Sequence, residues 1–361
     1  MARPAIAEIN LESIRANFRL ASSLTPNGKT VAVIKADAYG HGAVQVAEYL
    51  SADAEVFAVA CIEEALELRA SGLRHPILLL EGFFEIDELE TISREGFWTA
   101  VHRQEQIDQL AGTLLSAPVS VWLKVDTGMH RLGFHPALAF QAYKQLKAMR
   151  QVKDVVVMSH LANADDPSSH GVSVNSQLSK LPKSLTSPDI EMSLANSAGI
   201  LGYQMARKHW QRPGIMLYGA SPLVKENEHS VKLRPAMTLK SRVIATRWID
   251  IGESLGYGGR FIADRRTRVG TVAMGYADGY PRQAKDGTPV LVDGKRTRLI
   301  GRVSMDMLTI DLTDVRDSDV GSEVEFWGAN LSANEVATHC DTIAYHLFTG
   351  VTKRVHRRYV A

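Results

Sequence analysis

The chain has 361 residues, enough for two domains or for one barrel with an appendage. Hydrophobic residues make up 45% and charged residues 22%, which excludes a disordered chain and a fibrous repeat. The formal net charge of +1 is too small to supply the positive surface that nucleic-acid binding requires.

The compartment is expected to be a reducing cytoplasm. The first residues, MARPAIAEINLESIRANF, lack a basic stretch followed by an apolar segment, and no window has about 18 uninterrupted apolar residues. Cys61 and Cys340 are the only cysteines, too few for a disulfide framework or a thiolate metal site. We therefore expect no membrane partner, no nucleic-acid partner and no metal.

Between residues 30 and 220, short β-rich apolar runs alternate with amphipathic segments. There are eight runs, at 30–36, 54–60, 76–82, 98–102, 119–128, 154–162, 191–199 and 212–220. The segments between them, such as IEEALELRASG, repeat apolar residues with the spacing of one-sided helices. This alternation predicts an α/β fold, an eight-stranded (β/α)8 TIM-like barrel. The alternative is an open doubly wound sheet, but KADAYGHGA does not match its Gly-rich dinucleotide turn.

Beyond Glu228 the pattern changes to strand-like runs broken by Gly, Pro and Asp turns, without helices between them. We therefore expect a barrel over 11–228 and a C-terminal all-β domain over 229–361, which the strand-forming residues 1–10 join. Residues 332–351 are amphipathic, and Ser332 with Glu335 has the spacing of a capping box at a helix start.

Side chains at the carboxyl ends of barrel strands converge on one mouth, where active sites of this fold lie. Polar residues stand at or just after the ends of several runs: Lys35, Lys124, Asp126, Arg131, His160, Asn196 and Ser197. Arg212, Gly214 and Ile215 instead open the eighth run, so their place in the barrel depends on where that strand begins.

Lys35 follows four apolar residues, and desolvation there would lower the lysine pKa toward the neutral amine that Schiff-base chemistry needs. The alternative is a lysine that extends into solvent or pairs with Asp37. The turn at 39–42 (YGHG) either presents N–H groups to an anion or simply connects strand and helix. Ser197 lies near runs seven and eight, where barrels frequently bind phosphate. A Schiff-base lysine with a phosphate site suggests pyridoxal phosphate.

Seven segments together resemble the alanine racemases, the fold-type III pyridoxal-phosphate family. They are AVIKADAYGHG (32–42), KVDTGMHRLGF (124–134), SLANSAG (193–199), RPGIMLYG (212–219), GYGGRF (256–261), GYADGYPR (275–282) and GRVSMDM (301–307). They span nearly the whole chain in the family's order.

The resemblance implies pyridoxal 5'-phosphate bound covalently to Lys35. The residues implied to hold its phosphate are Tyr39, Ser197, Tyr345 and the backbone of Gly214 and Ile215. Arg212 would face the pyridine nitrogen, with His160 behind it. Because a guanidinium does not give up its proton at physiological pH, that nitrogen would stay unprotonated and the ring would withdraw fewer electrons.

Racemisation requires two acid/base groups on opposite faces of the substrate Cα. The resemblance assigns them to Lys35, acting on the D-isomer, and to Tyr257 of the neighbouring subunit, acting on the L-isomer, so it implies a homodimer with shared active sites. A free tyrosine has a pKa of about 10, so Tyr257 would need cationic neighbours to act as a base. From the residues alone, a tyrosine flanked by glycines is equally a turn residue.

Arg131 and the backbone at Met305 are implied to bind the substrate carboxylate, with Asp306 nearby in a structural role. From the sequence alone, Arg131 could equally be a loop arginine in a surface ion pair. Lys124 corresponds to a lysine that is carbamylated in many relatives, where it provides an anion for that arginine. The sequence departs from the family's pattern at Asp37, at His130 and in the tail KRVHRRYV.

The resemblance predicts an enzyme that interconverts L- and D-alanine, either for cell-wall precursors or for alanine catabolism. A broad-specificity amino-acid racemase remains an alternative. A non-catalytic pyridoxal-phosphate-binding barrel is a second, although a carrier needs no second base. A third, a decarboxylase of basic amino acids, has no matching C-terminal cysteine motif in this chain.

Overall fold

The computed structural model describes residues 3–361. Eight parallel strands close into a barrel in chain order. They are β2 (Lys29–Val33), β3 (Val56–Val59), β4 (Ile77–Leu79), β5 (Trp98–Val101), β6 (Val119–Lys124), β7 (Val152–Met158), β8 (Met192–Ser193) and β9 (Trp210–Gln211). The closure is made by β9, which pairs with β2 and sets Gln211 opposite Thr30. The predicted (β/α)8 architecture is confirmed.

Helical segments surround the barrel. They are α1 (Leu11–Ser23), α2 (Lys35–Gly40), α3 (Ala43–Leu50), α4 (Ile62–Ala70), α5 (Glu88–Glu95), α6 (Gln104–Gly112), α7 (Pro136–Lys147), α8 (Val174–Ser179) and α9 (Ser197–Gly202). Most bury one face, α9 is buried along nearly its whole length, and α2 is a left-handed turn at the barrel mouth. Short 3-10 helices lie at η1 (Lys183–Leu185), η2 (Gln204–Ala206), η3 (Ile215–Tyr218) and η4 (Ser230–Lys232). All six residues of β6 are buried because its sheet is covered on both faces.

The predicted eighth strand at 212–220 is wrong. The strand that closes the barrel is β9 at Trp210–Gln211, and Ile215–Tyr218 forms the 3-10 helix η3. Pro213 has no N–H to give to a ladder, and Gly214 leaves the extended conformation with φ −115° and ψ −97°. Arg212 and Gly214 therefore follow a strand end, at the mouth of the barrel.

The second half of the chain and the N-terminal strand together form an eight-stranded sheet. Its strands are β1 (Ile6–Asn10), β10 (Met237–Ile249), β13 (Thr267–Val272), β14 (Pro289–Val292), β15 (Lys295–Arg298), β16 (Leu308–Asp311), β17 (Glu323–Trp327) and β18 (His356–Val360). A separate hairpin joins β11 (Ser254–Leu255) to β12 (Phe261–Ile262), with η5 (Tyr257–Gly259) between them, and η6 (Tyr276–Asp278) follows β13. As expected, the N-terminal strand β1 joins this sheet, antiparallel to β10 and parallel to β18.

Two helices precede the last strand, α10 (Ala333–His339) and α11 (Ala344–Gly350). The amphipathic segment is thus broken near Asp341, which adopts a left-handed φ of 49°. Ser332 stands at the start of α10 as predicted, but its side chain makes no capping hydrogen bond, so the predicted capping box is wrong.

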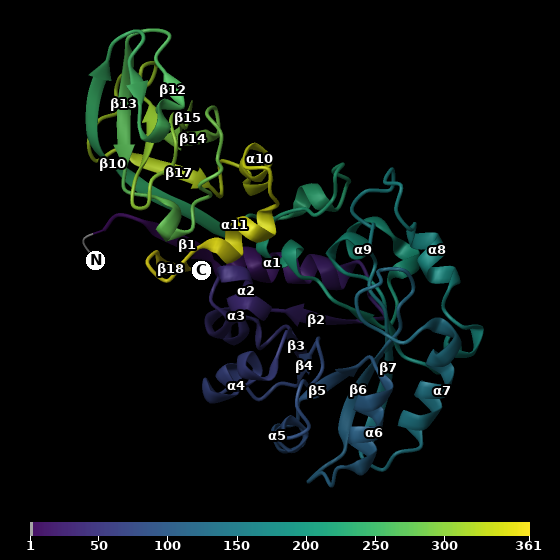
Figure 1. Ribbon diagram of the computed structural model, residues 1–361. Coiled ribbons are helices and arrows are strands. Elements are labelled where there is room, and N and C mark those ends of the chain that lie inside the picture. Colours follow the sequence, from purple (N-terminus) through teal and green to yellow (C-terminus); the bar gives the residue numbers. More distant parts are fainter. Residues whose placement is uncertain (1–2) are drawn as a thin grey trace.

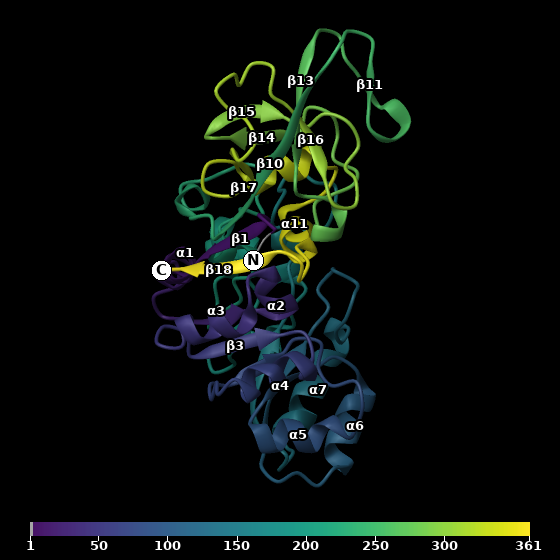
Figure 2. The same ribbon diagram turned by 90° about the vertical axis from the view of Figure 1, so that its left-hand side faces the viewer.

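The β sheet lies at one end of the molecule and the barrel at the other (Figures 1 and 2). Both views place α11, β1 and β18 at the junction, next to α2 of the barrel (Figures 1 and 2). Helix α11 therefore lies at the mouth of the barrel, beside α2. None of the helices in residues 3–361 is long and apolar enough to cross a membrane.

Candidate active site

A cavity of about 440 Å³ opens at the mouth of the barrel. Ten of the residues expected at the site line it: Lys35, Tyr39, Lys124, Arg131, His160, Ser197, Arg212, Gly214, Ile215 and Tyr345. Nine come from barrel segments at or after strand ends, and Tyr345 comes from α11. The cavity therefore lies where the barrel meets the second half of the chain.

Lys35 begins an unusual turn. Ala36, Asp37, Ala38 and Tyr39 all have φ between 52° and 54°, so they form a left-handed turn of non-glycine residues. This conformation costs an L-residue about 1 to 2 kcal/mol, so the surrounding structure must stabilise the turn. The turn directs both Lys35 and Tyr39 into the cavity.

Hydrogen bonds account for part of that stabilisation. The carboxylate of Glu64 accepts the N–H of Ala36 (2.7 Å). The Nδ1 atom of His41 lies 3.0 Å from the carbonyl oxygens of both Ala38 and Tyr39. Since both partners are acceptors, Nδ1 carries the proton. Burial lowers the pKa of His41 to about 3, so its ring is neutral at physiological pH.

Backbone hydrogen bonds use amides of the segment 39–42 internally. The N–H groups of His41 and Gly42 donate to the carbonyls of Ala38 (3.1 Å) and Asp37 (2.9 Å). The Asp37 carboxylate receives the N–H of Ala43 (2.8 Å). The N–H groups of His41 and Gly42 are therefore not available to an anion, and the interpretation of 39–42 as a backbone anion site is wrong at these two residues. The side chain of Tyr39 faces the cavity instead.

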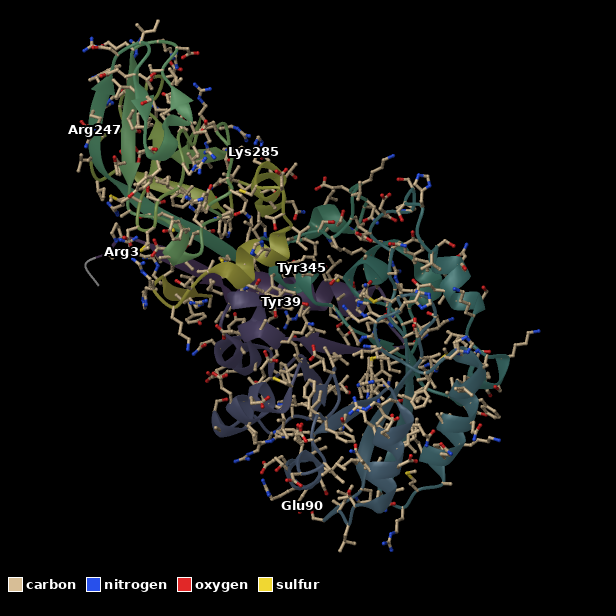
Figure 3. The ribbon with its side chains drawn as sticks, viewed as in Figure 1. Arg3, Tyr39, Glu90, Arg247, Lys285 and Tyr345 are labelled. Atoms are coloured by element: carbon tan, nitrogen blue, oxygen red, sulfur yellow. The ribbon has the colours of Figure 1, made fainter. Side chains whose placement is uncertain are left out.

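A group of neutral donors lines one side of the cavity. The Ser197 hydroxyl accepts the N–H groups of Gly214 (2.9 Å) and Met216 (3.3 Å). Tyr345 lies beside Tyr39 (Figure 3). The centroids of their rings are 5.9 Å apart. Burial raises the pKa of Tyr39 to about 12 and also raises that of Tyr345, so both phenols keep their protons. A Cβ on Gly214 would lie 2.5 Å from the Tyr39 Oη, so only glycine permits this close approach.

Arg212 lies at the inner wall and is buried. One of its terminal nitrogens donates to the carbonyl of Ser159 (2.6 Å) and the other to the Ser193 hydroxyl. Burial lowers the pKa of Arg212 to about 10, which leaves the guanidinium charged at neutral pH. Burial, with Arg212 and other nearby cations, lowers the pKa of His160 well below its ordinary value. His160 is therefore a neutral neighbour of a fixed positive charge.

The cavity is electropositive. Its lining contains four cationic side chains, Lys35, Lys124, Arg131 and Arg212, and one carboxylate, Glu81. Burial is the largest cause that lowers the pKa of Lys124 to about 8, and the three other cations add to it. A site of this charge favours an anionic occupant.

Three expected residues do not line the cavity. Tyr257 lies in η5, with 69% of its surface exposed, and Met305 is 52% exposed. The Met305 carbonyl accepts the N–H of Ala277 (3.0 Å), and the Asp306 carboxylate accepts a hydrogen bond from Arg354 (2.7 Å). All three belong to the second half of the chain, where Tyr257 and Met305 are exposed and Asp306 is half-buried.

Sequence reasoning missed two polar residues of the lining, Glu81 and Thr349. Glu81 follows β4, so the strand-end rule that singled out His160 could have found it. Thr349 lies four residues after Tyr345 on α11 and therefore on the same helix face. The i, i+4 spacing from Tyr345 points to Thr349 only if both residues lie in one helix.

Comparison with known proteins agrees with this geometry. Residues 9–222 match the family "Alanine racemase, N-terminal domain" and residues 236–359 match "Alanine racemase, C-terminal domain". The chain belongs to the alanine racemase family.

Individual alanine racemases are similar over nearly their whole length. The catabolic alanine racemase of Pseudomonas putida is 53% identical over 99% of both chains. The crystal structure of biosynthetic alanine racemase from Pseudomonas aeruginosa has a TM-score of 0.95 and 45% identity, covering 99% of this chain and 100% of that one. The alanine racemase of Bartonella henselae, solved with covalently bound pyridoxal phosphate, has a TM-score of 0.86 and 31% identity over 99% of both chains.

Proposed function

We propose that this protein is a pyridoxal-phosphate-dependent racemase that interconverts L-alanine and D-alanine. The observation that carries the proposal is that Lys35, the buried Arg212 guanidinium and several hydrogen-bond donors suited to a phosphate line the same cavity. Family membership supports the same reaction, since the similar proteins are alanine racemases. The substrate is a small amino acid.

The residues of the cavity fit the cofactor. Its phosphate would be held by the phenols of Tyr39 and Tyr345, the Ser197 hydroxyl and the backbone at Gly214 and Ile215. The Gly214 N–H, which donates to the Ser197 hydroxyl (2.9 Å), would then exchange that acceptor for the phosphate. Neutral hydroxyls and N–H groups in a positive cavity are suitable donors for a phosphate dianion. Bound pyridoxal phosphate would supply an electron sink that stabilises negative charge at the substrate Cα.

The chain's own side chains would bind the cofactor and move protons around it. Lys35 would bind the cofactor covalently through Nζ and exchange a proton with Cα on one face. Arg212 would donate to the pyridine nitrogen and keep it unprotonated, because its pKa of about 10 remains far above neutrality. His160 would pack behind Arg212. Because its pKa is lowered well below the ordinary value, its ring would stay neutral and would not take a proton from the guanidinium.

The second acid/base group would be Tyr257 of a partner subunit. Its exposure of 69% would be covered in a homodimer, where the cations of the partner's cavity could stabilise the phenolate. Met305 would reach the same cavity through its backbone, supported by Asp306. We therefore propose a homodimer in which 11–228 binds the cofactor and 1–10 with 229–361 complete the partner's site.

Arg131 would bind the substrate carboxylate, since it lines the cavity on the loop after β6. Lys124 would serve as a carbamate that pairs with Arg131. The lowered pKa of Lys124 favours the neutral amine, which adds CO2 and releases one proton to form the anion. We also propose a cytoplasmic location, where the thiols of Cys61 and Cys340 would stay reduced.

The first experiment reduces the pyridoxal-phosphate-loaded protein with borohydride and maps the label by mass spectrometry. Visible absorbance before reduction and label on Lys35 are expected. Label on another lysine, or no label, would contradict the assignment. Measuring racemisation of a panel of amino acids then separates an alanine-specific enzyme from a broad-specificity one and from a non-catalytic carrier.

The second experiment tests the two-base arrangement with Tyr257→Phe. Exchange of the substrate α-hydrogen with deuterated solvent should slow more for L-alanine than for D-alanine, because the phenol would act on one face only. Tyr143→Phe, on the outer helix α7, is the matched control and should leave both rates unchanged. Equal loss from the two isomers would contradict two dedicated bases.

A further inference from the structure

The C-terminal strand contacts the turn that begins at Lys35. Arg357 of β18 donates from Nε to the carbonyl of Gly40 (2.7 Å), the last residue of that turn. Its terminal nitrogens lie 3.1 Å from the carbonyl of Val351 and 3.5 Å from that of Thr352. Since Val351 and Thr352 directly follow α11, one guanidinium joins the end of α2 to the end of the helix that carries Tyr345.

The two joined segments touch through their backbones. A Cβ on Gly40 would lie 2.2 Å from the carbonyl oxygen of Phe348 in α11. The ring of His41 packs edge-on against Phe348, with centroids 5.2 Å apart. Any movement of α11 relative to α2 therefore changes the spacing between Tyr39 and Tyr345 at the cavity.

Strand β18 makes a second contact just beyond the turn, at the start of α3. The hydroxyl of Tyr359 donates to the side-chain oxygen of Gln45 (3.1 Å). A Cβ on Gly42 would lie 2.0 Å from the Tyr359 Oη, so the phenol rests directly on this glycine. Arg357 and Tyr359 share one face of the strand because side chains alternate. Arg358, on the other face, pairs with Glu8 of β1.

The turn itself explains why this contact matters. Four consecutive left-handed residues have no intrinsic preference for the conformation, and Gly40 continues it with φ of 80°. A charge-assisted hydrogen bond to the Gly40 carbonyl anchors the end of the turn that is farthest from Lys35. The Asp37 carboxylate, 3.9 Å from the same guanidinium, adds attraction at the middle of the turn.

We propose that Arg357 is a positioning residue for the cofactor site. It holds the turn of Lys35 and Tyr39 against α11, so that these residues and Tyr345 keep one spacing. This role rests on the proposed function, because it acts through the lysine and the phenols that would bind pyridoxal phosphate. The chain's last strand thereby controls how firmly the barrel retains its cofactor.

The test compares Arg357→Met with Arg358→Met in the pyridoxal-phosphate-loaded protein. Both variants remove one positive charge and the contacts that it makes, but on opposite faces of the strand. The dissociation rate of pyridoxal phosphate should rise at least about tenfold in Arg357→Met and stay within about twofold of wild type in Arg358→Met, because preorganisation is lost only in the first. The apoproteins' unfolding temperatures and their affinities for pyridoxal phosphate are measured alongside.

A second variant, Arg357→Lys, keeps the charge and one donor to the Gly40 carbonyl but cannot reach both segments. Its dissociation rate should lie between those of wild type and Arg357→Met, and it provides the test if the methionine variant does not fold. Equal rates in the Arg357 and Arg358 variants, or a lowered unfolding temperature with unchanged cofactor retention, would overturn the proposal. A wild-type chain that binds no pyridoxal phosphate would contradict the proposed function and this role with it, whereas cofactor-retaining Arg357 variants would contradict this role alone.

Discussion

Replacing Gly40 by alanine is the most direct test of the contact between α2 and α11. An added Cβ would meet the Phe348 carbonyl oxygen at 2.2 Å, far inside van der Waals contact. Neither atom belongs to a flexible side chain, so the two segments must separate by about 1 Å. The variant also places a side chain at a φ of 80°.

The magnitude follows from these two costs. The left-handed conformation costs alanine about 1 to 2 kcal/mol. Overpacking of this kind adds about 1 to 3 kcal/mol, which gives about 2 to 5 kcal/mol in total. With an unfolding entropy of about 2.1 cal/mol/K per residue, the unfolding temperature of the chain should fall by about 3 to 7 °C.

Gly96→Ala is the matched control. Gly96 ends α5 with a φ of 68°, and a Cβ there would meet nothing within 4 Å. It therefore carries the conformational cost alone, about 1 to 3 °C. Differential scanning calorimetry of both variants measures the difference, which reports the clash. Equal unfolding temperatures would refute the close contact that we describe, and with it the coupling of Tyr39 to α11.

Three further predictions concern buried polar groups. Ser197→Ala removes the acceptor of two buried N–H groups, so calorimetry of the apoprotein should show a loss of about 2 to 4 kcal/mol, and an unchanged protein would contradict those hydrogen bonds. Asp278→Asn removes the negative charge of a buried carboxylate that accepts a hydrogen bond from Arg3 (2.6 Å). The free energy of unfolding should fall by only about 1 to 3 kcal/mol, because Arg3 can turn to solvent; urea unfolding measures this loss. In apoprotein prepared without CO2, Lys124 is a free amine whose pKa is lowered to about 8, mainly by burial. Between about pH 8 and about pH 10.5 the unfolded chain therefore binds the proton and the folded chain does not, so the stability of wild type relative to Lys124→Met should rise over this range; parallel pH profiles would exclude this.

Much of the site could be predicted from the strand-end rule. His160 and Ser197 follow β7 and β8, and both line the cavity. The rule failed for the eighth strand, because the apolar run at 212–220 has the composition of a strand although Pro213 and Gly214 prevent a ladder there. Tyr345 could be connected to the site only through the resemblance, since it lies in a helix far along the chain.

The left-handed turn had no signal in the sequence. Residues 36–39 contain no glycine, the residue that normally marks a positive φ, so local propensity predicts an ordinary strand-to-helix connection. The conformation exists because Glu64, His41 and Arg357 hold the turn from three directions. None of these contacts follows from the order of residues within the turn.

The order of apolar and polar residues was sufficient to determine the alternation of strands and helices, the barrel and the change to a β-rich second half, because burial on two faces or on one imposes its own period on the chain. Tertiary structure alone decided which distant residues meet. Gly40 and Arg357 are 317 positions apart, and they touch only because β18 pairs with β1 at the junction of the two halves. Contacts of this separation depend on the packing of whole elements, which no local pattern encodes.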